Sequence, residues 1–389
     1  MTSSLPAPVL ITNPDGIDRL VEKITGLPAV AVDTESNSLY AYRERVCLIQ
    51  FSTPKIDYLV DPLALDDLSP LDRIFRNPEV EKIFHAAEYD LICMKRDYNF
   101  EFANLFDTMV AARILGREEV GLGSMLECEF GVKLDKRYQR ANWGQRPLPD
   151  YLLAYARLDT HYLISLRDRL HDELVAKNLW PLAPEDFNRM CQVNGRNNEN
   201  KSEDCFRVNG AHDLPPQKAT VLLELCRYRD YVARKVDRPL FKVISDRILL
   251  TVASHCPRNL NELAELHGLT QPTLQRHGKG LLAAVERGLK EQPVFPARSP
   301  RPNDQYLSRL ESLRSWRKNT AVKMGVKSDV VLPRDLMFVL AEQNPCCQKN
   351  LAAVLESVPW RLEHFGDQIL AVLQSKAQAQ TARLIRNNT

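Results

Sequence analysis

The sequence predicts an α/β domain with a mixed sheet flanked by helices, followed by two smaller all-α domains. Three observations predict this fold class. Short apolar runs of strand length fill the first hundred residues, a polar stretch without periodicity follows residue 193, and the second half repeats itself at a fixed offset. With 389 residues and 44% hydrophobic content, the chain is large enough for two or three ordinary cores.

Four apolar runs predict the strands of the sheet. They are Ala29 to Glu35, Val46 to Ser52, Ile56 to Val60 and Lys82 to His85. Three successive strand signals, followed by alternating strand and helix patterns, favour a mixed sheet covered by helices. Acidic residues stand at the ends of these runs, where open sheets typically place their functional sites.

A pair of carboxylates closes the first run. Asp33 and Glu35 are separated by one residue at the end of an apolar stretch that reads as a buried strand. Residues i and i+2 of a strand point to the same side, so both side chains can reach one cation. This pattern predicts the beginning of a site for a hard metal ion.

Two further acidic positions follow downstream. A short β-like stretch changes to a helical pattern at His85, so Asp90 is expected near the start of a helix. From Pro149 to about Lys177 the apolar residues recur at helical spacing, and Tyr155 and Asp159 are four residues apart in this run. Residues at that spacing share a helix face, which would place the phenol beside the carboxylate.

Carboxylates from three separate segments predict a site for two divalent cations, Mg²⁺ or Mn²⁺. These ions prefer oxygen ligands and complete their coordination with water and substrate phosphate oxygens. Two ions about 4 Å apart can stabilise both the attacking and the leaving oxygen of a phosphodiester displacement. The sequence contains no zinc-type Cys/His spacing, P-loop, GxGxxG or GxSxG motif that would indicate another chemistry.

Charge divides the chain into two halves. Residues 1–200 hold 23 Lys and Arg against 31 Asp and Glu, a net charge of −8, whereas residues 201–389 hold 29 against 19, a net charge of +10. A basic half beside an acidic metal site suits a polyanionic substrate, although surface Lys and Arg can equally serve solubility alone. The polar stretch 194–203 and the proline-rich stretch 292–302 are the predicted linkers.

The second half contains an internal repeat at an offset of 88 residues without a gap. The matched pairs are Leu222 and Leu310, Leu225 and Leu313, Arg229 and Arg317, Ala253 and Ala341, Pro257 and Pro345, Leu263 and Leu351, Leu274 and Leu362, Gly278 and Gly366, and Leu282 and Leu370. Matched apolar positions at helical spacing indicate two copies of one small helical domain. The predicted domains are therefore 1–200, 214–291 and 303–378.

Residues 10 to 200 resemble the DEDD exonucleases, in particular the branch with Tyr in its last motif and the ribonuclease D family within it. The resemblance rests on seven motifs. These are Val32-Asp33-Thr34-Glu35, Cys47-Leu48-Ile49-Gln50-Phe51, Phe84-His85-Ala86, Phe106-Asp107-Thr108, Lys133-Leu134-Asp135-Lys136, Trp143-Gly144-Gln145-Arg146-Pro147-Leu148 and Tyr155 through Asp159. It implies a ribonuclease-H-like exonuclease domain, and the repeats resemble the helicase-and-ribonuclease-D C-terminal (HRDC) domain, a nucleic-acid-binding module.

Carried over residue by residue, the resemblance implies five catalytic residues. Asp33, Glu35, Asp90 and Asp159 would be metal ligands, and Tyr155 would orient the attacking water. The spacing of these residues predicts the same five positions. This chain departs from the family pattern at Ala87-Glu88-Tyr89, where many relatives have Gly-Ser-Glu, and at Arg157, where Ala is common; neither change removes a ligand.

Four further residues are candidates for substrate binding, each with a structural alternative. His85 could contact the 3′-terminal nucleotide or serve as a structural hydrogen-bond donor. Gln50 could face the substrate groove or find its partners within the sheet. Trp143 and Arg146 could supply a stacking ring and a phosphate contact, or form a packed aromatic beneath a cation.

The resemblance implies a metal-dependent 3′-to-5′ exoribonuclease that releases nucleoside 5′-monophosphates, with tRNA precursors as the expected RNA. A DNA exonuclease of the same fold and a non-catalytic RNA-binding protein are the alternatives. The amino terminus shows no basic region followed by an apolar run, and no apolar stretch approaches the ~20 residues of a membrane span, so a cytoplasmic location is expected. The sequence leaves the oligomeric state open, with a monomer favoured. The nine cysteines are assigned no chemistry, with buried free thiols expected at Cys47, Cys93 and Cys128.

Overall fold

A computed structural model describes residues 5–195, 203–295 and 303–386 of the chain. Most of each predicted linker, 196–202 and 296–302, lies outside the described residues. The chain divides into two compact units. The first contains residues 1–35, 46–195 and 301–389, and the second contains residues 36–45 and 196–300. The second helical copy therefore belongs to the unit that holds the sheet, and the first copy forms a unit with residues 36–45.

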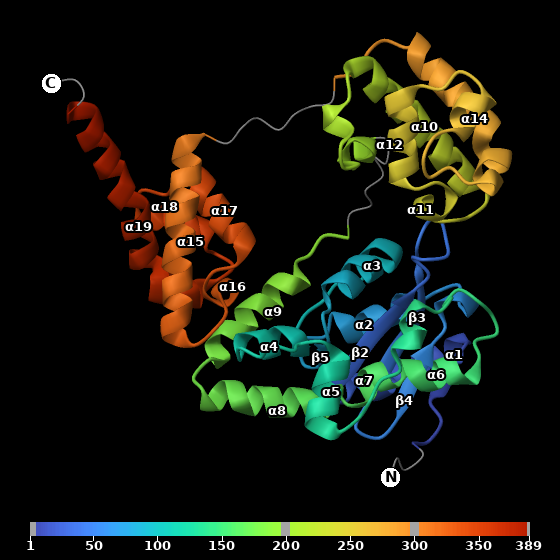
Figure 1. The fold of residues 1–389 in the computed structure, drawn as a ribbon. Helices are drawn as coiled ribbons and strands as arrows, with labels where there is room; N and C mark the ends of the chain where they lie inside the picture. The colour runs from blue at the N-terminus through green and yellow to red at the C-terminus, as the bar shows by residue number, and fades with distance from the viewer. Residues whose placement is uncertain (1–4, 196–202, 296–302, 387–389) are drawn as a thin grey trace. The chain divides into compact units, whose positions relative to one another are not determined.

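A six-stranded mixed sheet forms the centre of the first unit (Figure 1). Its strands are β1 (Val9–Ile11), β2 (Ala29–Ser36), β3 (Val46–Ser52), β4 (Asp57–Val60), β5 (Glu81–Phe84) and β6 (Leu105–Asp107). Their order in the sheet is β1-β4-β3-β2-β5-β6. The four predicted strands are present, and the fold class is confirmed. The three-residue strands β1 and β6 at the two edges were not predicted.

The strand directions bring the acidic strand ends to one edge of the sheet. β2 runs parallel to β5, with Ala31 opposite Ile83, and β5 runs parallel to β6. β3 runs antiparallel to β4, which in turn is parallel to β1. The carboxyl ends of β2, β5 and β6 consequently lie at the same edge of the sheet. Asp33 lies near the end of β2, His85 directly follows β5, and Asp107 is the last residue of β6.

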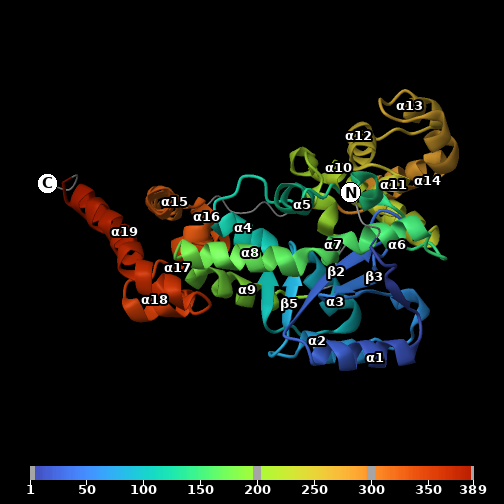
Figure 2. The same cartoon turned by 90° about the horizontal axis from the view of Figure 1, so that it is seen from below.

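Nine helices accompany the sheet within residues 5–195. They are α1 (Pro14–Thr25), α2 (Asp72–Phe75), α3 (Glu88–Tyr98), α4 (Thr108–Ile114), α5 (Leu122–Phe130), α6 (Asp150–Ala156), α7 (Leu158–His161), α8 (Leu163–Ala176) and α9 (Ala183–Cys191). Figure 2 shows α1 on one side of the strands and α8 on the other. α1 begins with Asn13, whose side chain accepts the Gly16 N–H, and with Pro14 in its first turn.

The helical run predicted from Pro149 to Lys177 is divided into α6, α7 and α8. The breaks fall at Arg157 and Tyr162, which keep right-handed helical φ and ψ angles. Tyr155 therefore lies one residue before the end of α6 and Asp159 belongs to α7, so the two residues are not on one continuous helix. Because the backbone stays helical between them, the four-residue spacing still places the two side chains on neighbouring turns.

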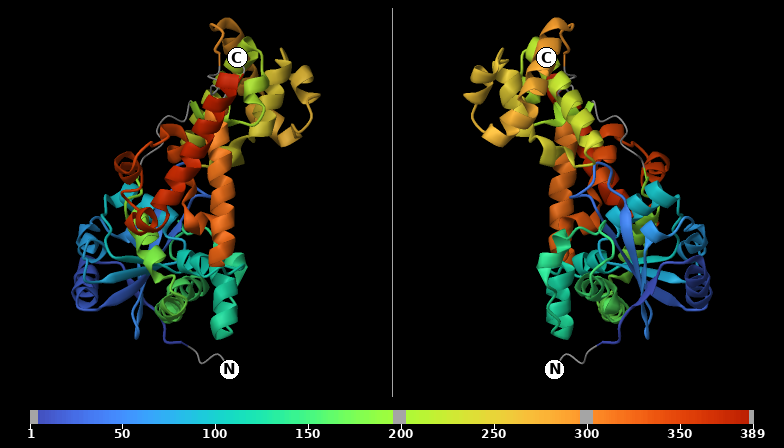
Figure 3. Two further views of the ribbon diagram at one scale, coloured as in Figure 1. Left: turned by 90° about the vertical axis from the view of Figure 1, so that its left-hand side faces the viewer. Right: turned by 90° about the vertical axis from the view of Figure 1, so that its right-hand side faces the viewer.

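The second helical domain follows residue 303. Its helices are α15 (Asp304–Met324), α16 (Ser328–Val331), α17 (Arg334–Gln343), α18 (Gln348–Val354) and α19 (Pro359–Arg386). Figure 3 shows α15 and α19 side by side, and apolar residues from all five helices form a core. Val330 also packs into the core of the sheet domain.

A buried arginine attaches this domain to the sheet domain. Arg361 on α19 is fully buried, and its guanidinium contacts Glu185 at 2.8 Å and Asp186 at 2.9 Å, both on α9. It also donates to the Val330 carbonyl at 2.9 Å. A buried charge is tolerated only when it is paired and hydrogen-bonded, so these contacts fix the second helical domain on α9.

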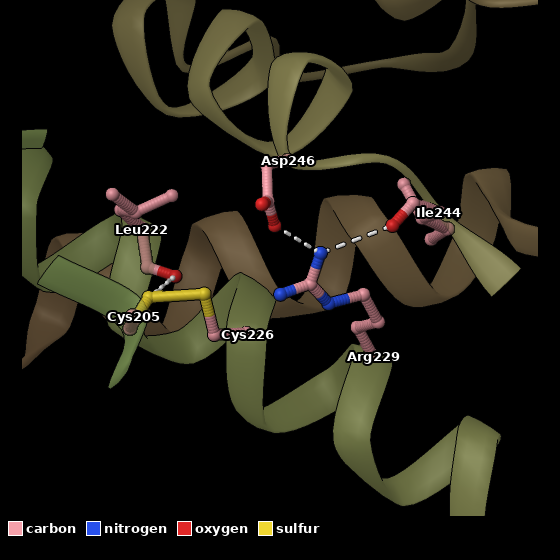
Figure 4. The surroundings of a disulfide bond; sticks show 6 residues. All are labelled: Cys205, Leu222, Cys226, Arg229, Ile244 and Asp246. Atoms are coloured by element: carbon pink, nitrogen blue, oxygen red, sulfur yellow. Dashed lines mark hydrogen bonds and ion pairs between the residues drawn. A yellow bond between two sulfur atoms is a disulfide. The ribbon is translucent and has the colours of Figure 1, made fainter. Parts of the chain in front are cut away.

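The first helical domain contains α10 (Pro216–Lys235), α11 (Leu240–Val243), α12 (Asp246–His255), α13 (Leu260–Ala264) and α14 (Gln271–Lys290). Each of these helices begins 88 residues before its counterpart in the second domain, so the repeat in the sequence is a repeat in structure. A disulfide joins Cys205, in a short 3-10 helix ahead of α10, to Cys226 on α10 (Figure 4). No disulfide was predicted.

The other cysteines are free, and their burial follows the prediction only in part. Cys47 and Cys93 are buried as expected, but Cys128 on α5 is exposed. The buried residues of α5 are Met125 and Leu126, and Cys128 lies beyond them in the exposed part of the helix, so its apolar neighbours in the sequence were misleading. No helix among the described residues is both long enough and apolar enough to cross a membrane.

Candidate active site

Three of the predicted ligands form a cluster at the edge of the sheet. Asp33 and Glu35 on β2 and Asp159 on α7 each offer a carboxylate oxygen, and these oxygens lie within 4.8 Å of one another. The strand alternation explains why residues 33 and 35 point together. Asp159 joins them because α7 lies against the sheet.

Hydrogen bonds next to Asp159 hold α7 in this place. Thr160, the following residue, is fully buried, and its hydroxyl lies 2.7 Å from the Ser52 hydroxyl at the end of β3. Ser52 donates to Asp57 Oδ1 at 2.7 Å, and His161 Nδ1 lies 2.9 Å from Asp57 Oδ2. These contacts connect the helix that carries Asp159 to two strands.

Asp90, the fourth predicted ligand, lies next to the cluster. It is in the first turn of α3, and its carboxylate accepts a hydrogen bond from the Thr34 hydroxyl. Thr34 stands between Asp33 and Glu35, so it ties the fourth carboxylate to the strand that carries two others. Asp90 is not among the three residues whose oxygens fall within the 4.8 Å limit.

The start of α3 is fixed by a second buried carboxylate. Asp107 at the end of β6 accepts the Ala87 N–H at 2.7 Å and the Val110 N–H at 2.9 Å. The preceding residue, Ala86, has a φ of 63°, a conformation that costs free energy for any residue with a Cβ atom. Asp107 therefore holds the strained turn that places Asp90.

The four acidic side chains carry negative charge that their surroundings do not balance. Burial, and then the charges of Asp90, Asp159 and Glu35, raise the pKa of Asp33 well above its usual range. Burial likewise raises the pKa of Asp90 and of Asp159 to about 7. Within the described residues, no Lys or Arg forms an ion pair with any of the four acids. A divalent cation would supply the missing positive charge, and four carboxylates are the donor set that Mg²⁺ and Mn²⁺ prefer.

Tyr155 lies beside the cluster with its ring packed in an apolar group. The ring is 6.2 Å from that of Trp143 and 5.6 Å from that of Tyr138, centroid to centroid. Burial raises the pKa of the Tyr155 hydroxyl, and the negative charges of Asp159, Glu35 and Asp33 raise it further. The phenol is therefore protonated in this state and can donate a hydrogen bond to a group held among the acids.

His85 and Gln50 both contact neighbours within the sheet domain. The Thr108 hydroxyl donates to Phe84 O at 3.0 Å and lies 2.9 Å from His85 Nδ1, so Nδ1 carries the proton and donates to Thr108. Burial lowers the pKa of His85 to about 4, which leaves the ring neutral with Nε2 as an acceptor. Gln50 is fully buried, and its Nε2 donates to Asp33 Oδ2 at 3.4 Å. The geometry favours the structural alternative for Gln50.

Trp143 and Arg146 also take the structural alternative in this geometry. Trp143 is 1% exposed and lies beneath Tyr155 in an apolar group, so a base has no access to its ring. The Arg146 guanidinium binds both carboxylate oxygens of Asp61 at 2.6 Å and the Cys47 carbonyl at 2.7 Å. Its donors are thus used within the protein, where they fix the segment that packs on Tyr155.

Thr34 and Asp107 were not predicted to have roles in the site, although both lie in motifs that carry the family resemblance. Thr34 occupies the middle of Asp33-Thr34-Glu35, and its partner Asp90 is 56 residues away. Asp107 follows an apolar stretch too short to be read as a strand. The sequence signal that could have identified Asp107 is a carboxylate at the end of a strand, the same signal that identified Asp33.

Comparison with known families agrees with this geometry. The profile of the 3′-5′ exonuclease family matches residues 8–175, and the HRDC domain profile matches residues 218–285 and 307–373. The fold and its acidic site thus define a protein with one 3′-5′ exonuclease domain and two HRDC domains. Protein RRP6-like 2 of Arabidopsis thaliana is 30% identical over 292 residues, which are 72% of this chain and 33% of the plant protein.

Ribonuclease D of Escherichia coli (strain K12) is 34% identical over 280 residues, which cover 72% of this chain and 74% of that protein. The crystal structure of Escherichia coli RNase D gives a TM-score of 0.69 at 28% identity and covers 95% of this chain and 99% of that one. The chain belongs to the ribonuclease D family. It spans only 33–50% of the length of the RRP6-type relatives from Arabidopsis and yeast.

Proposed function

We propose that this protein is a 3′-to-5′ exoribonuclease that uses two divalent cations and releases nucleoside 5′-monophosphates from RNA 3′ ends. One observation carries the proposal. Oxygens of Asp33, Glu35 and Asp159 lie within 4.8 Å of one another, and Thr34 holds Asp90 at their side. No described Lys or Arg forms an ion pair with these acids, so the site is suited to bind cations rather than to form internal salt bridges.

The four carboxylates and Tyr155 would have different roles in this reaction. Asp33, Glu35 and Asp159 would hold one cation, and Asp33 and Asp90 would help to hold the second. Bound cations of this type activate water and stabilise the leaving oxygen of a phosphodiester. Tyr155 would hold the attacking water through its protonated hydroxyl, and its position on the turn before Asp159 supports that role.

Other residues would act by holding the ligands in place. Gln50 donates to Asp33, Thr34 donates to Asp90, and Asp107 fixes the turn before α3. His85, with its neutral ring and free Nε2 acceptor, remains the candidate for a contact with the 3′-terminal nucleotide, because hydroxyl groups of a ribose can donate to it.

The proposed substrates are the 3′ ends of structured RNAs such as tRNA precursors. The solved RNase D relative is described as an exoribonuclease involved in structured RNA processing, which supports this choice. The proposed location is the cytoplasm, where such an RNA substrate would be met, and the proposed form is a monomer. Mg²⁺ and Mn²⁺ are both consistent with an all-carboxylate site.

A product assay with labelled strands tests the proposal. The full-length protein is incubated with 5′-labelled RNA and with a DNA of the same sequence, each with and without Mg²⁺ or Mn²⁺. Successive shortening of the RNA from its 3′ end, only with metal, is the expected result. Preferential shortening of DNA would make the protein a DNA exonuclease of the same fold. An absence of nucleotide release with either metal would leave a binding protein that retains the fold.

A further inference from the structure

The equivalent stretches of the two helical domains, the end of α10 with α11 and the end of α15 with α16, have different surroundings. In the second domain, the end of α15 and the short helix α16 pack against the exonuclease domain. Val330 is buried in the exonuclease core, Val326 packs beside it, and Asp329 forms an ion pair with Arg113 on α4. This face of the second domain is therefore occupied by protein.

The corresponding stretch of the first domain is the end of α10 and the short helix α11. Residues 36–45 cover part of it. The Tyr42 hydroxyl donates to Asp230 Oδ1 at 2.6 Å, and the Tyr42 N–H donates to Asp237 Oδ1 at 3.0 Å. The two acidic groups of this stretch thus already accept hydrogen bonds from the protein.

The remainder of the stretch exposes aromatic rings and cations. Tyr231 is 63% exposed and Phe241 is 56% exposed, values that are high for rings of this size. Lys235 and Arg238 are exposed, and neither forms an ion pair with any residue that the structure describes. We define the α10–α11 surface as Tyr231, Arg234, Lys235, Arg238, Phe241 and Lys242.

The positions along the helix favour a continuous surface. Tyr231 and Lys235 are four residues apart on α10 and so share one of its sides. Lys242 on α11 lies 4.2 Å from the centroid of the Tyr40 ring, which adds a half-exposed aromatic residue from the loop. Two exposed rings and four cations thus lie within twelve residues of sequence, with three of the cations between the rings.

We propose that the α10–α11 surface binds single-stranded RNA, with Tyr231 and Phe241 stacking on bases and the cations contacting phosphates. Exposed rings beside cations fit this ligand, because every base has a face that stacks and every nucleotide carries a negative charge. Lys235 and Arg238 form no ion pair among the described residues, whereas Arg234 pairs with Asp230 at 3.3 Å. The inference rests on the proposed function, since it assigns to one HRDC domain the contact with RNA beyond the 3′ end.

The second domain supports the assignment by contrast. The residues 88 positions further along are Asn319, Val322, Lys323, Val326, Asp329 and Val330. They include no aromatic residue and one cation, and several of them form the protein contact described above. The second helical domain therefore uses this stretch to pack against the exonuclease domain, whereas the first helical domain leaves it available for RNA.

Binding of a labelled single-stranded RNA to the full-length protein tests the proposal. Fluorescence anisotropy is measured with EDTA present, so that hydrolysis does not consume the RNA. Y231A and F241A should each weaken binding by roughly 5- to 100-fold, as expected for the loss of one stacked base. The double variant K235Q/R238Q should reduce the slope of log K against log salt by about 1.4, which is 0.7 for each lost phosphate contact.

A charge-matched control is available at the other end of α10. Lys218 near the start of α10 donates to Ser254, and Gln217 donates to Gly288, so Arg258 and Lys290 lie far from the α10–α11 surface. R258Q/K290Q should leave affinity and slope unchanged. Equal affinity and equal slope for all variants would overturn the proposal and leave the surface as a protein contact. Because hydrolysis is not measured, a failure here is separate from a failure of the exonuclease assay.

Discussion

The Thr34 hydroxyl donates a hydrogen bond to the carboxylate of Asp90, 56 residues further along the chain. This bond joins the strand that carries Asp33 and Glu35, two of the proposed metal ligands, to the helix that carries Asp90, another proposed ligand. It lowers the pKa of Asp90, whereas burial and the charge of Asp107 raise it. A single hydroxyl thus helps to keep Asp90 ionised in a site where burial favours the neutral acid.

Thr34→Val should weaken metal binding without unfolding the protein, because valine keeps the shape of threonine and loses its donor. Hydrogen bonds to charged groups contribute about 1.5 to 3 kcal/mol, so the metal concentration for half-maximal activity should rise by roughly 10- to 150-fold near neutral pH. Thr34→Ser keeps the donor and should restore it. An unchanged metal requirement in the valine variant would show that the bond has no part in ligand placement.

The metal-free protein should lose stability as the pH rises. The pKa values of Asp90 and Asp159 are raised to about 7 in the folded state. Between about pH 4 and pH 7 the folded state therefore holds more protons than the unfolded state, so the unfolding free energy falls with rising pH and levels off above that range. Melting temperatures in EDTA should show this fall, and Asp90→Asn should show a smaller one.

Saturating Mn²⁺ should oppose the loss of stability that the metal-free protein shows as the pH rises. Protons compete with the cation for the same oxygens, so the rise in melting temperature on adding Mn²⁺ should be larger at pH 8 than at pH 5.5. A rise that is the same at both pH values, or that is larger at the lower one, would mean that the ion binds elsewhere.

Arg361 gives a test of the contact between the second HRDC domain and the exonuclease domain. Arg361→Met leaves Glu185 and Asp186 without their buried partner, and removing one member of a buried pair costs about 3 to 5 kcal/mol. The melting temperature should fall by several degrees. Arg189→Met, which removes the exposed pair with Asp335 at the same contact, should cost less than about 1 kcal/mol. Equal effects would contradict the role assigned to Arg361.

The disulfide can be tested by counting thiols. Cys205 and Cys226 are bonded and the other seven cysteines are free, so denatured protein prepared without reductant should show seven thiols and reduced protein nine. Closing a loop of this length stabilises a fold by about 3 kcal/mol, and reductant should therefore lower the melting temperature. Cys205→Ser should melt at the same temperature with and without reductant. Nine thiols before reduction would contradict the bond.

Local patterns in the sequence predicted most of the exonuclease fold. The apolar runs of β2 to β5 fixed four strands, because such runs have few other stable environments. The spacing of Asp33 and Glu35 predicted that they would point together, and their oxygens lie close to each other and to Asp159. The repeat at 88 residues predicted two helical domains whose helices begin in register.

Contacts between distant segments could not be predicted from local patterns. Trp143 and Arg146 were candidates for substrate contact, because the sequence alone does not show whether a ring or a cation is exposed or buried. In the structure Trp143 packs against Tyr155 and Arg146 pairs with Asp61. The disulfide was missed because cysteine spacing alone does not reveal pairing. The docking of α19 on α9 depends on Arg361, whose partners lie about 175 residues away.

The central claim, a metal-dependent exonuclease site built on Asp33, is tested most directly by Asp33→Ala. Single-turnover shortening of 5′-labelled RNA is measured for the wild-type and variant proteins at saturating Mn²⁺, with circular dichroism to confirm that both are folded. The variant should bind the RNA normally and lose at least a hundredfold in rate, since its remaining acids cannot neutralise two dications. Shortening of the RNA at a rate near that of the wild type would show that the reaction does not depend on this site.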